Sequence, residues 1–364
     1  MTRRTVLMVA LVCALVGGIV SSCAPAPSTT TPSTPTSPTT PTTPAQPSSQ
    51  VTKWKMQTHL VPNHSEHLQT IKMADAIRVA TAGRLDITVY STGELVPTAN
   101  MMDAIEEGVL EFGMAWPGYF SGMEPSFVIY AGLPYGLKTL EEYIWMIKYG
   151  GFEDLVREIV AKHGVHVVEL GVACPYGELS SKVPIRKVED FQGVKIRSYG
   201  EYTKIFEHFG ARGVTMAAGE IYTGLATGTI DAAIWGGPKL HHDLKLHEVA
   251  KYWITPPMAA FIGNMVMVNP KEWNALPADI REMLKSIVFE YHLQYPIETH
   301  YFDALALQDM VDNWNVEVCT LPPAETAKLQ AFAESRWDEL AKIDAYSARA
   351  IGMFKELMSL KGYI

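Results

Sequence analysis

Arg197 and Trp235 are the two residues of this 364-residue chain whose type and position point most directly to chemistry. Each stands at the end of a short β-like run, 194–197 and 230–235, and a helical pattern that begins near Gly200 lies between the two runs. Strands and helices that alternate at this spacing are typical of α/β folds, which bind ligands at the carboxyl ends of their strands. A guanidinium is a planar fork that engages a carboxylate through two parallel hydrogen bonds, and it stays protonated in proteins. We therefore predict that these side chains form a pocket for a small carboxylate.

The residues before this region have the pattern of a first lobe. Short β-like runs predict strands at 53–58, 85–90 and 112–116, and the spacing of apolar residues predicts helices at 65–82 and 97–107. The order is β-α-β-α-β, which is typical of a sheet covered by helices.

The chain then crosses to a second lobe and returns. A long helical segment at 139–163 and a strand at 165–171 lead to the second lobe, and a strand at 262–268 leads back to the first. These two crossings predict a hinge, because strands at a lobe border can absorb the movement that closes the lobes. Farther on, 278–313 has the pattern of a long helix that Pro296 bends or interrupts. A short strand and a helical segment that ends near Leu360 complete the chain.

The first 22 residues have the layout of a secretory signal peptide. Arg3 and Arg4 precede an apolar run at 6–20, and small residues lead to Cys23. This layout resembles that of bacterial lipoproteins, in which the cysteine after the small residues is lipidated. The apolar run is shorter than the ~20 residues that a membrane-spanning helix needs. We therefore expect a signal peptide at 1–22 and a lipid anchor on Cys23, with export by either the general or the twin-arginine route.

Residues 24–50 predict an extended tether. They comprise only Ala, Pro, Ser, Thr and Gln, and prolines recur at every third position from 32 to 47. This composition favours polyproline II and offers no apolar face to bury. At ~3.1 Å per residue the tether reaches roughly 80 Å, so we expect 23–50 to hold a folded body away from a membrane surface.

Charge and cysteine content limit the possible partners. The chain has 30 Lys and Arg against 39 Asp and Glu residues, a formal net charge of −9, and no basic patch interleaved with aromatic residues. Nucleic acid is therefore not an expected partner, because its phosphates are bound by such patches. Cys174 and Cys319 form either a disulfide, which is permitted outside the cytoplasm, or two buried thiols.

Short motifs follow one another along the body in a fixed order and spacing. They are Gly-Glu-Leu-Val-Pro at 93–97, Asp-Ala-Ile-Glu-Glu-Gly-Val at 103–109, Leu-Pro-Tyr-Gly at 133–136, Gly-Val-Lys-Ile-Arg at 193–197, Glu-Ile-Tyr at 220–222 and Thr-Gly-Thr-Ile-Asp-Ala at 227–232. Over roughly 53–345 the body thereby resembles the DctP-type solute-binding proteins of tripartite ATP-independent periplasmic (TRAP) transporters, closest to the keto-acid-binding branch.

The resemblance implies a fold and a function. The fold is α/β, with two lobes like those of periplasmic binding proteins, hinge strands and long C-terminal helices. Its expected parts are lobe I at 51–173, lobe II at 174–258, a return to lobe I with the long helix at 259–321, and C-terminal helices at 322–364. The implied function is that of a receptor, not an enzyme, which captures a small organic carboxylate between its lobes and delivers it to a TRAP-type membrane permease. We expect a monomer or homodimer that is exported to the periplasm or cell surface.

The resemblance also implies roles for individual residues. In that family an arginine at the place of Arg197 binds the substrate carboxylate, and Tyr119 matches an aromatic residue of the keto-acid-binding branch. Trp235 falls where that branch has a tryptophan beside a metal-binding glutamate. Here Ile234 precedes the tryptophan and has no ligand oxygen, so we expect no cofactor, and the sequence leaves open whether a metal ion accompanies the substrate. Trp116 is either a ligand contact or part of the core.

The loop at 174–179 departs from the family's polar and aromatic pattern. Its Tyr176 and Glu178 either reach the cleft or lie in a solvated loop. A carboxylate at Glu178 would repel an anionic ligand unless it accepted a hydrogen bond from a hydroxyl or ammonium group.

A metal-dependent hydrolase is an alternative from another class of protein. His241, His242, Asp243 and His247 lie close together, and one helical turn separates the last two. No further cluster supplies a ligand at zinc-site spacing, and the chain has neither H-E-x-x-H nor G-x-S-x-G. We therefore predict that these residues form a solvated helix surface. The two histidines at 63–67 are likewise expected to border the cleft or solvent.

A ligand-binding sensor component is the other alternative. Such a protein binds its ligand between similar lobes but reports to a membrane kinase instead of a permease. Nothing in the sequence marks the partner surface, so the two roles stay open at this point.

Overall fold

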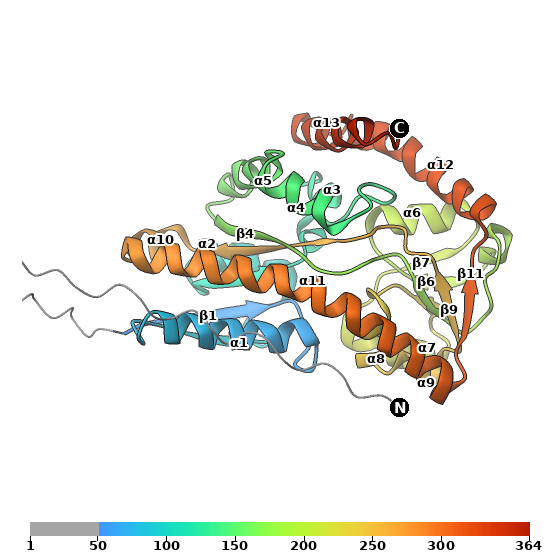
Figure 1. Cartoon of the computed structure of the whole chain (residues 1–364), viewed down its shortest axis with the longest axis horizontal. Coiled ribbons are helices and arrows are strands. Elements are labelled where there is room, and N and C mark those ends of the chain that lie inside the picture. The colour runs from blue at the N-terminus through green and yellow to red at the C-terminus, as the bar shows by residue number, and fades with distance from the viewer. Residues whose placement is uncertain (1–50) are drawn as a thin grey trace, which may run out of the picture. The chain divides into compact units, whose positions relative to one another are not determined.

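Residues 51–364 form the body that the computed structural model describes (Figure 1). The expected signal peptide at 1–22, the lipid site at Cys23 and the tether at 24–50 lie outside the described residues. Within 51–364, no helix is both long enough and apolar enough to cross a membrane.

The described body contains two sheets, of which the first has the strand order β2-β1-β3-β10-β4. Its strands are β1 (Thr52–Thr58), β2 (Leu85–Tyr90), β3 (Phe112–Ala115), β4 (His166–Val172) and β10 (Gly263–Val268). β1 runs parallel to β2 and β3, whereas β10 runs antiparallel to both of its neighbours. β10 is the strand that returns from the second lobe, and it lies inside this sheet.

Helices cover both faces of the first sheet. α1 (Ser65–Ala80) and α11 (Ala278–Trp314) pack on one face, and α4 (Leu140–Lys148), α5 (Phe152–Ala161) and α13 (Ala345–Leu360) pack on the other. Shorter helices are α2 (Met101–Glu106), α3 (Phe127–Tyr130) and α10 (Pro270–Ala275). Side chains alternate along β10, so Val266 and Val268 face α1 and α11, whereas Met265 and Met267 face the other layer. Both faces of this strand are therefore buried.

The second sheet has the strand order β11-β9-β5-β8-β6-β7. Its strands are β5 (Leu179–Ser181), β6 (Lys195–Arg197), β7 (Arg212–Val214), β8 (Ala232–Ala233), β9 (Tyr252–Thr255) and β11 (Glu317–Thr320). Its helices are α6 (Gly200–His208), α7 (Ile221–Thr227), α8 (Pro238–Asp243) and α9 (Leu246–Val249). Because β6 is parallel to both β7 and β8, the carboxyl ends of these strands lie at one edge. The predicted two-lobed α/β fold is thus confirmed.

α11 spans both lobes. It packs on α1 in the first lobe and on α8 and α9 in the second, and Figure 1 shows it running beside all three. Its 37 residues extend over about 55 Å at 1.5 Å per residue. The strand that follows, β11, pairs with β9 of the second sheet, although the sequence pattern places all of 259–321 with the first lobe. α12 (Pro323–Leu340) then leads back to α13 on the first lobe.

The segment at 139–163, which the sequence predicts as one long helical segment, is divided, whereas the predicted C-terminal helices are confirmed as two. The segment at 139–163 becomes α4 and α5, because Gly151 adopts a left-handed conformation (φ 80°) between them. The C-terminal segment becomes α12 and α13, and Asp344 begins α13 by accepting a hydrogen bond from the backbone N–H of Ser347. Pro296 does not interrupt α11. The backbone hydrogen bond that a proline removes is outweighed by burial of the helix on both lobes.

Cys174 and Cys319 are both buried and unpaired in the described body. Of the two alternatives that the sequence left open, the fold therefore contains two buried thiols. Burial raises the pKa of both thiols, which keeps them protonated at neutral pH.

Candidate functional site

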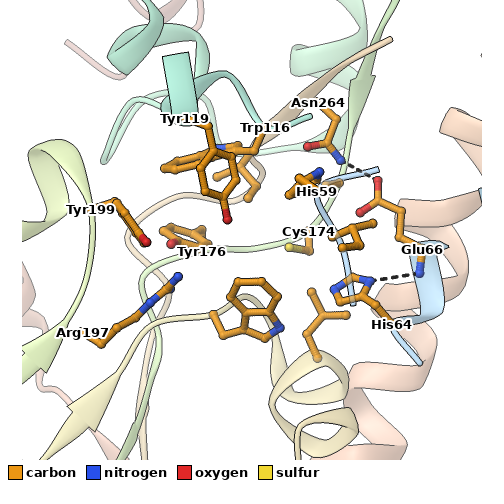
Figure 2. A pocket seen from close by; sticks show the side chains of 15 residues that line it. His59, His64, Glu66, Trp116, Tyr119, Cys174, Tyr176, Arg197, Tyr199 and Asn264 are labelled. Atoms are coloured by element: carbon orange, nitrogen blue, oxygen red, sulfur yellow. Dashed lines mark hydrogen bonds between the residues drawn. The ribbon is translucent and has the colours of Figure 1, made fainter. Parts of the chain in front are cut away.

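A pocket lies between the two lobes (Figure 2). Its walls follow the carboxyl ends of β1, β3 and β4 in the first lobe and of β6 and β8 in the second. Open α/β sheets bind ligands at this place, because the strand ends and the loops after them face a crevice.

Arg197, the last residue of β6, places its guanidinium in this pocket, and the residue is only 1% exposed. Its Nε donates a hydrogen bond to the carbonyl oxygen of Met216 at 3.2 Å, and its Nη1 donates to that of Ile234 at 2.6 Å. None of the ion pairs that arginines form within 51–364 involves Arg197. Two of the five N–H donors of a guanidinium are thereby used, and three remain for a ligand.

Two aromatic rings hold the guanidinium in place. Its central carbon lies 4.5 Å from the ring centroid of Tyr199 and 5.2 Å from that of Trp235. Tyr199 is itself fixed, because its hydroxyl donates to the carbonyl oxygen of Met216 at 2.8 Å. Cation–π contacts of this kind stabilise a guanidinium without neutralising its charge. The positive charge thus remains available to an anion.

Three further aromatic side chains line the pocket near Arg197. The ring centroid of Trp116 lies 5.7 Å from that of Tyr119 and 6.2 Å from that of Tyr176. Burial raises the pKa of Tyr119 to about 12 and also raises the pKa of Tyr176. Both hydroxyls are therefore neutral at pH 7, and Figure 2 shows both tyrosines facing the same space as Arg197. They can donate hydrogen bonds to an anion beside the guanidinium.

A buried histidine positions Trp235, which follows β8. The backbone N–H of Trp235 donates to Nε2 of His241 at 3.1 Å, and Nδ1 of His241 lies 2.8 Å from the hydroxyl oxygen of Ser180. Because Nε2 accepts, the ring proton belongs on Nδ1, which donates to Ser180. Burial lowers the pKa of His241 to about 3, so the ring is neutral. The indole Nε1 of Trp235 is buried and has no hydrogen-bond partner within the described body.

The prediction of a solvated helix surface around these histidines is wrong for two of them. His241 is 0% exposed in α8 and His247 is 3% exposed in α9. The chain turns between the two helices at Lys245 (φ 57°), so Asp243 and His247 are not one turn apart on a common helix. Among residues 51–364, no group of three His, Cys, Asp or Glu side chains is arranged to hold a metal ion.

The wall opposite Arg197 carries two histidines, a glutamate and an asparagine (Figure 2). Glu66, in the first turn of α1, accepts a hydrogen bond from Nδ2 of Asn264 at 2.5 Å, and burial raises its pKa to about 7. Burial lowers the pKa of His59 to about 4 and that of His64 to about 3. Both rings are neutral at pH 7, so this wall offers hydrogen bonds but no positive charge.

Most residues that the sequence singled out come together in the pocket. Those that line it are Arg197, Trp235, Tyr119, Trp116 and Tyr176. Trp116 also belongs to the core cluster of the second lobe, so it is both a pocket residue and a core residue. Its Nε1 donates to the carbonyl oxygen of Ala131 at 2.7 Å, which fixes the ring.

Glu178 lies apart from the pocket. It is 7% exposed, its carboxylate accepts a hydrogen bond from the hydroxyl of Thr255 at 2.7 Å, and burial raises its pKa to about 7. It is not among the pocket residues, and the loop that carries it is buried, not solvated. β5 begins at the next residue, so pairing of this strand with β9 draws Glu178 towards Thr255.

Sequence reasoning missed Tyr199, Glu66 and Asn264. Tyr199 follows Arg197 by two residues, and side chains at that spacing on an extended chain point to the same side. That spacing is a signal which identifies Tyr199 in retrospect. Glu66 and Asn264 are 198 residues apart and meet only because β10 returns to the first sheet, which no local pattern reveals.

The donors of the pocket do not fit a metal ion bound with the ligand. The resemblance implies a metal-binding glutamate before Trp235, but Ile234 stands there and is fully buried. Glu66 is the one carboxylate among the described residues that line the pocket, and Asn264 engages one of its oxygens. Ca²⁺ takes about six to eight oxygen ligands, among which carboxylates are prominent. The pocket offers donors for an anion and lacks such a shell for a cation.

Two curated proteins are similar to this chain over most of its body. The monocarboxylate 2-oxoacid-binding periplasmic protein of a Nostoc species is 29% identical over 248 residues, which are 66% of this chain and 66% of that protein, just under two thirds of either. The C4-dicarboxylate-binding periplasmic protein DctP of Rhodobacter capsulatus is 25% identical over 299 residues, which are 78% of this chain and 85% of that protein.

Solved structures share the fold. A TRAP periplasmic solute-binding protein of Colwellia psychrerythraea, solved with bound calcium and pyruvate, matches with a TM-score of 0.79 over 86% of this chain and 96% of that one, at 23% sequence identity. At this identity the likeness shows the fold alone. The model of the DctP family, described as bacterial extracellular solute-binding protein family 7, matches residues 56–343 and confirms the resemblance that the motifs predicted, so the chain belongs to this family.

Proposed function

We propose that the protein is an extracytoplasmic receptor which captures a small organic carboxylate between its lobes and delivers it, chemically unaltered, to a TRAP-type permease. The observation that carries this proposal is the environment of Arg197. The side chain is buried in the pocket and has no acidic partner among the described residues. Figure 2 shows its guanidinium end turned towards the pocket.

A buried and unpaired cation makes a carboxylate ligand favourable. Removal of a charge from water costs several kcal/mol unless an opposite charge and hydrogen bonds compensate for it. The free N–H donors of Arg197 can engage both oxygens of a carboxylate, and Tyr119 and Nε1 of Trp235 supply further donors within the pocket. The carboxylate of the ligand then supplies the negative charge that no acidic side chain of the described body supplies to Arg197.

The two lobes share the contacts to such a ligand. Arg197, Tyr199 and Trp235 come from the second lobe, whereas Trp116 and Tyr119 come from the first. A ligand that touches both lobes binds the closed form more tightly than the open form, and it therefore shifts the population towards closure. The connections from β4 to β5 and from β9 to β10, which join the two sheets, are the proposed hinge.

The names of the relatives support an organic acid as the ligand. The Nostoc protein is named for 2-oxo monocarboxylates and the R. capsulatus protein for C4 dicarboxylates, and the Colwellia structure contains pyruvate. A receptor role is also compatible with the sequence-based expectation of a lipid anchor at Cys23, which would keep the body beside a membrane permease.

Binding of acids and of their amides tests this proposal. A panel of small 2-oxo and hydroxy acids, pyruvate included, is expected to contain members that raise the unfolding temperature, because a ligand at 100 times its Kd adds about 2.7 kcal/mol of stability. The matching amide, such as pyruvamide, is expected to give no shift because it has no charge to pair with Arg197. The shift with the acid is expected to persist in the presence of a chelator. Equal shifts with acid and amide would contradict carboxylate recognition, and chemical conversion of the acid would contradict a receptor role.

A further inference from the structure

Charge is distributed unequally along the pocket. Arg197 is the only lysine or arginine among the described residues that line it, and Glu66 is the only aspartate or glutamate. Figure 2 shows these two side chains on opposite sides, with Glu66 next to Asn264, His59 and His64. One end therefore receives an anion, and the other end is suited to a different kind of group.

Glu66 is held firmly in its wall and has no cationic partner there. The residue is 7% exposed, and Oε1 accepts the hydrogen bond from Asn264 at 2.5 Å. No lysine, arginine or histidine forms an ion pair with Glu66 within the described body. A ligand carboxylate that reached this wall would thus meet an acidic group without a compensating cation.

The histidines beside Glu66 offer hydrogen bonds from neutral rings. Nδ1 of His59 lies 3.4 Å from the carbonyl oxygen of Met114, which can only accept, so the ring proton belongs on Nδ1 and Nε2 is an acceptor. Nδ1 of His64 accepts from the backbone N–H of Glu66 at 3.2 Å, so its proton belongs on Nε2, which is a donor. This wall can satisfy a hydroxyl, a carbonyl or an amide of a ligand.

We propose that Glu66, fixed by Asn264, makes the receptor selective for monocarboxylates that carry a neutral hydrogen-bonding group at the far end, and makes it reject dicarboxylates. This inference rests on the proposed function, because it assumes that Arg197 binds the first carboxylate. In this proposal, Glu66 distinguishes acids with one carboxylate from acids with two.

The groups that face Glu66 from the surrounding elements do not offset its charge. They are His59 and His64 after β1, Cys174 after β4, and Tyr291, His292 and Tyr295 on α11. Burial lowers the pKa of each of these histidines and raises that of Cys174 and of Tyr295, so these histidines, Cys174 and Tyr295 are neutral at pH 7. The charge of Lys239 on α8 helps to lower the pKa of His64, but its ammonium group forms an ion pair with the carboxylate of Asp243. When Glu66 is ionised, its negative charge is therefore not offset by a neighbouring cation.

Succinamate and succinate are a matched pair of probes for this proposal. They have the same length and shape, and they differ only in that one carboxylate of succinate is an amide in succinamate. Calorimetry at pH 8, where Glu66 is ionised, is expected to show that the wild-type protein binds succinamate at least about tenfold more tightly than succinate. Glu66→Gln is expected to reduce this ratio to less than about fivefold, because the wall then carries no acid. Equal affinities in the wild type, or an unchanged ratio in Glu66→Gln, would overturn the proposal.

Glu178→Gln is the matched control. Glu178 is as buried as Glu66, and burial raises the pKa of both to about 7, but Glu178 lies outside the pocket. This variant is expected to keep the wild-type ratio between the affinities for succinamate and succinate. If it changed the ratio as much as Glu66→Gln does, a general loss of buried charge would explain both effects and the proposal would fail.

The pH dependence of the wild type provides a second measurement that needs no variant. Glu66 is protonated below its raised pKa and ionised above it, so the affinity for succinate is expected to fall by about tenfold from pH 6 to pH 8, whereas the affinity for succinamate stays nearly constant. A flat profile for succinate would overturn the role of Glu66. If succinate and succinamate bind equally well, only this selectivity is lost, whereas tight binding of neutral succinamide alone would refute the proposed function itself.

Discussion

Replacement of Arg197 with alanine is expected to weaken the binding of small carboxylates by about 100-fold or more, which corresponds to about 3 kcal/mol. The guanidinium is buried, and no other lysine or arginine of the described body lines the pocket. Without it, the charge of the ligand would enter a desolvated space with only neutral donors. Titration calorimetry with an acid that stabilises the wild-type protein measures this loss.

Two controls separate a lost ligand contact from damage to the fold. Arg212→Ala, at an exposed position on β7, is expected to leave the affinity unchanged. Arg197→Met keeps much of the side-chain volume and removes a buried unpaired charge, so without ligand it is expected to be at least as stable as the wild type. Wild-type affinity in Arg197→Ala would show that another group binds the carboxylate.

Replacement of His241 with alanine is expected to lower the free energy of unfolding by about 3 kcal/mol. Both ring nitrogens of His241 are engaged, one by the backbone N–H of Trp235 and one by the hydroxyl of Ser180. The ring also contacts Trp253 edge-on, with 4.8 Å between the ring centroids. The substitution leaves two buried polar groups unpaired at about 1–3 kcal/mol each and opens a cavity. Ligand affinity is expected to fall as well, since the backbone at Trp235 is no longer held.

His242→Ala is the neighbouring control for this effect. His242 is partly exposed and its Nε2 lies 2.9 Å from a carboxylate oxygen of Asp309, which is also partly exposed. A pair of this kind contributes about 1 kcal/mol or less. Denaturant unfolding of the two variants is therefore expected to show a much larger loss for His241→Ala. Equal losses would mean that the buried hydrogen bonds of His241 do not stabilise this part of the fold.

The arginine end of the pocket can be predicted from sequence because it depends on local patterns. Short β-like runs that end in Arg197 and Trp235 indicate strands, and the structure pairs β6 with β8 in parallel, so both residues lie at one edge of a sheet. Tyr199 belongs to the same local pattern by its spacing. Identification of the family adds the order of the lobes, because its motifs extend over most of the body.

The opposite end depends on long-range pairing that local patterns do not contain. Glu66 and Asn264 meet only through the position of β10 in the first sheet. β11 joins the second sheet because α11 is long enough to carry the chain from one lobe to the other. The burial of His241 is equally hidden, since α8 has only six residues and a helix of that length shows no periodic apolar face.

A crystal structure of the protein with a bound small acid measures the position of the ligand carboxylate. We predict that its two oxygens lie within hydrogen-bond distance of Nη1 and Nη2 of Arg197, and that the rest of the ligand extends towards Glu66. An acid held by other residues, or a carboxylate of the protein itself paired with Arg197, would contradict carboxylate recognition by this arginine.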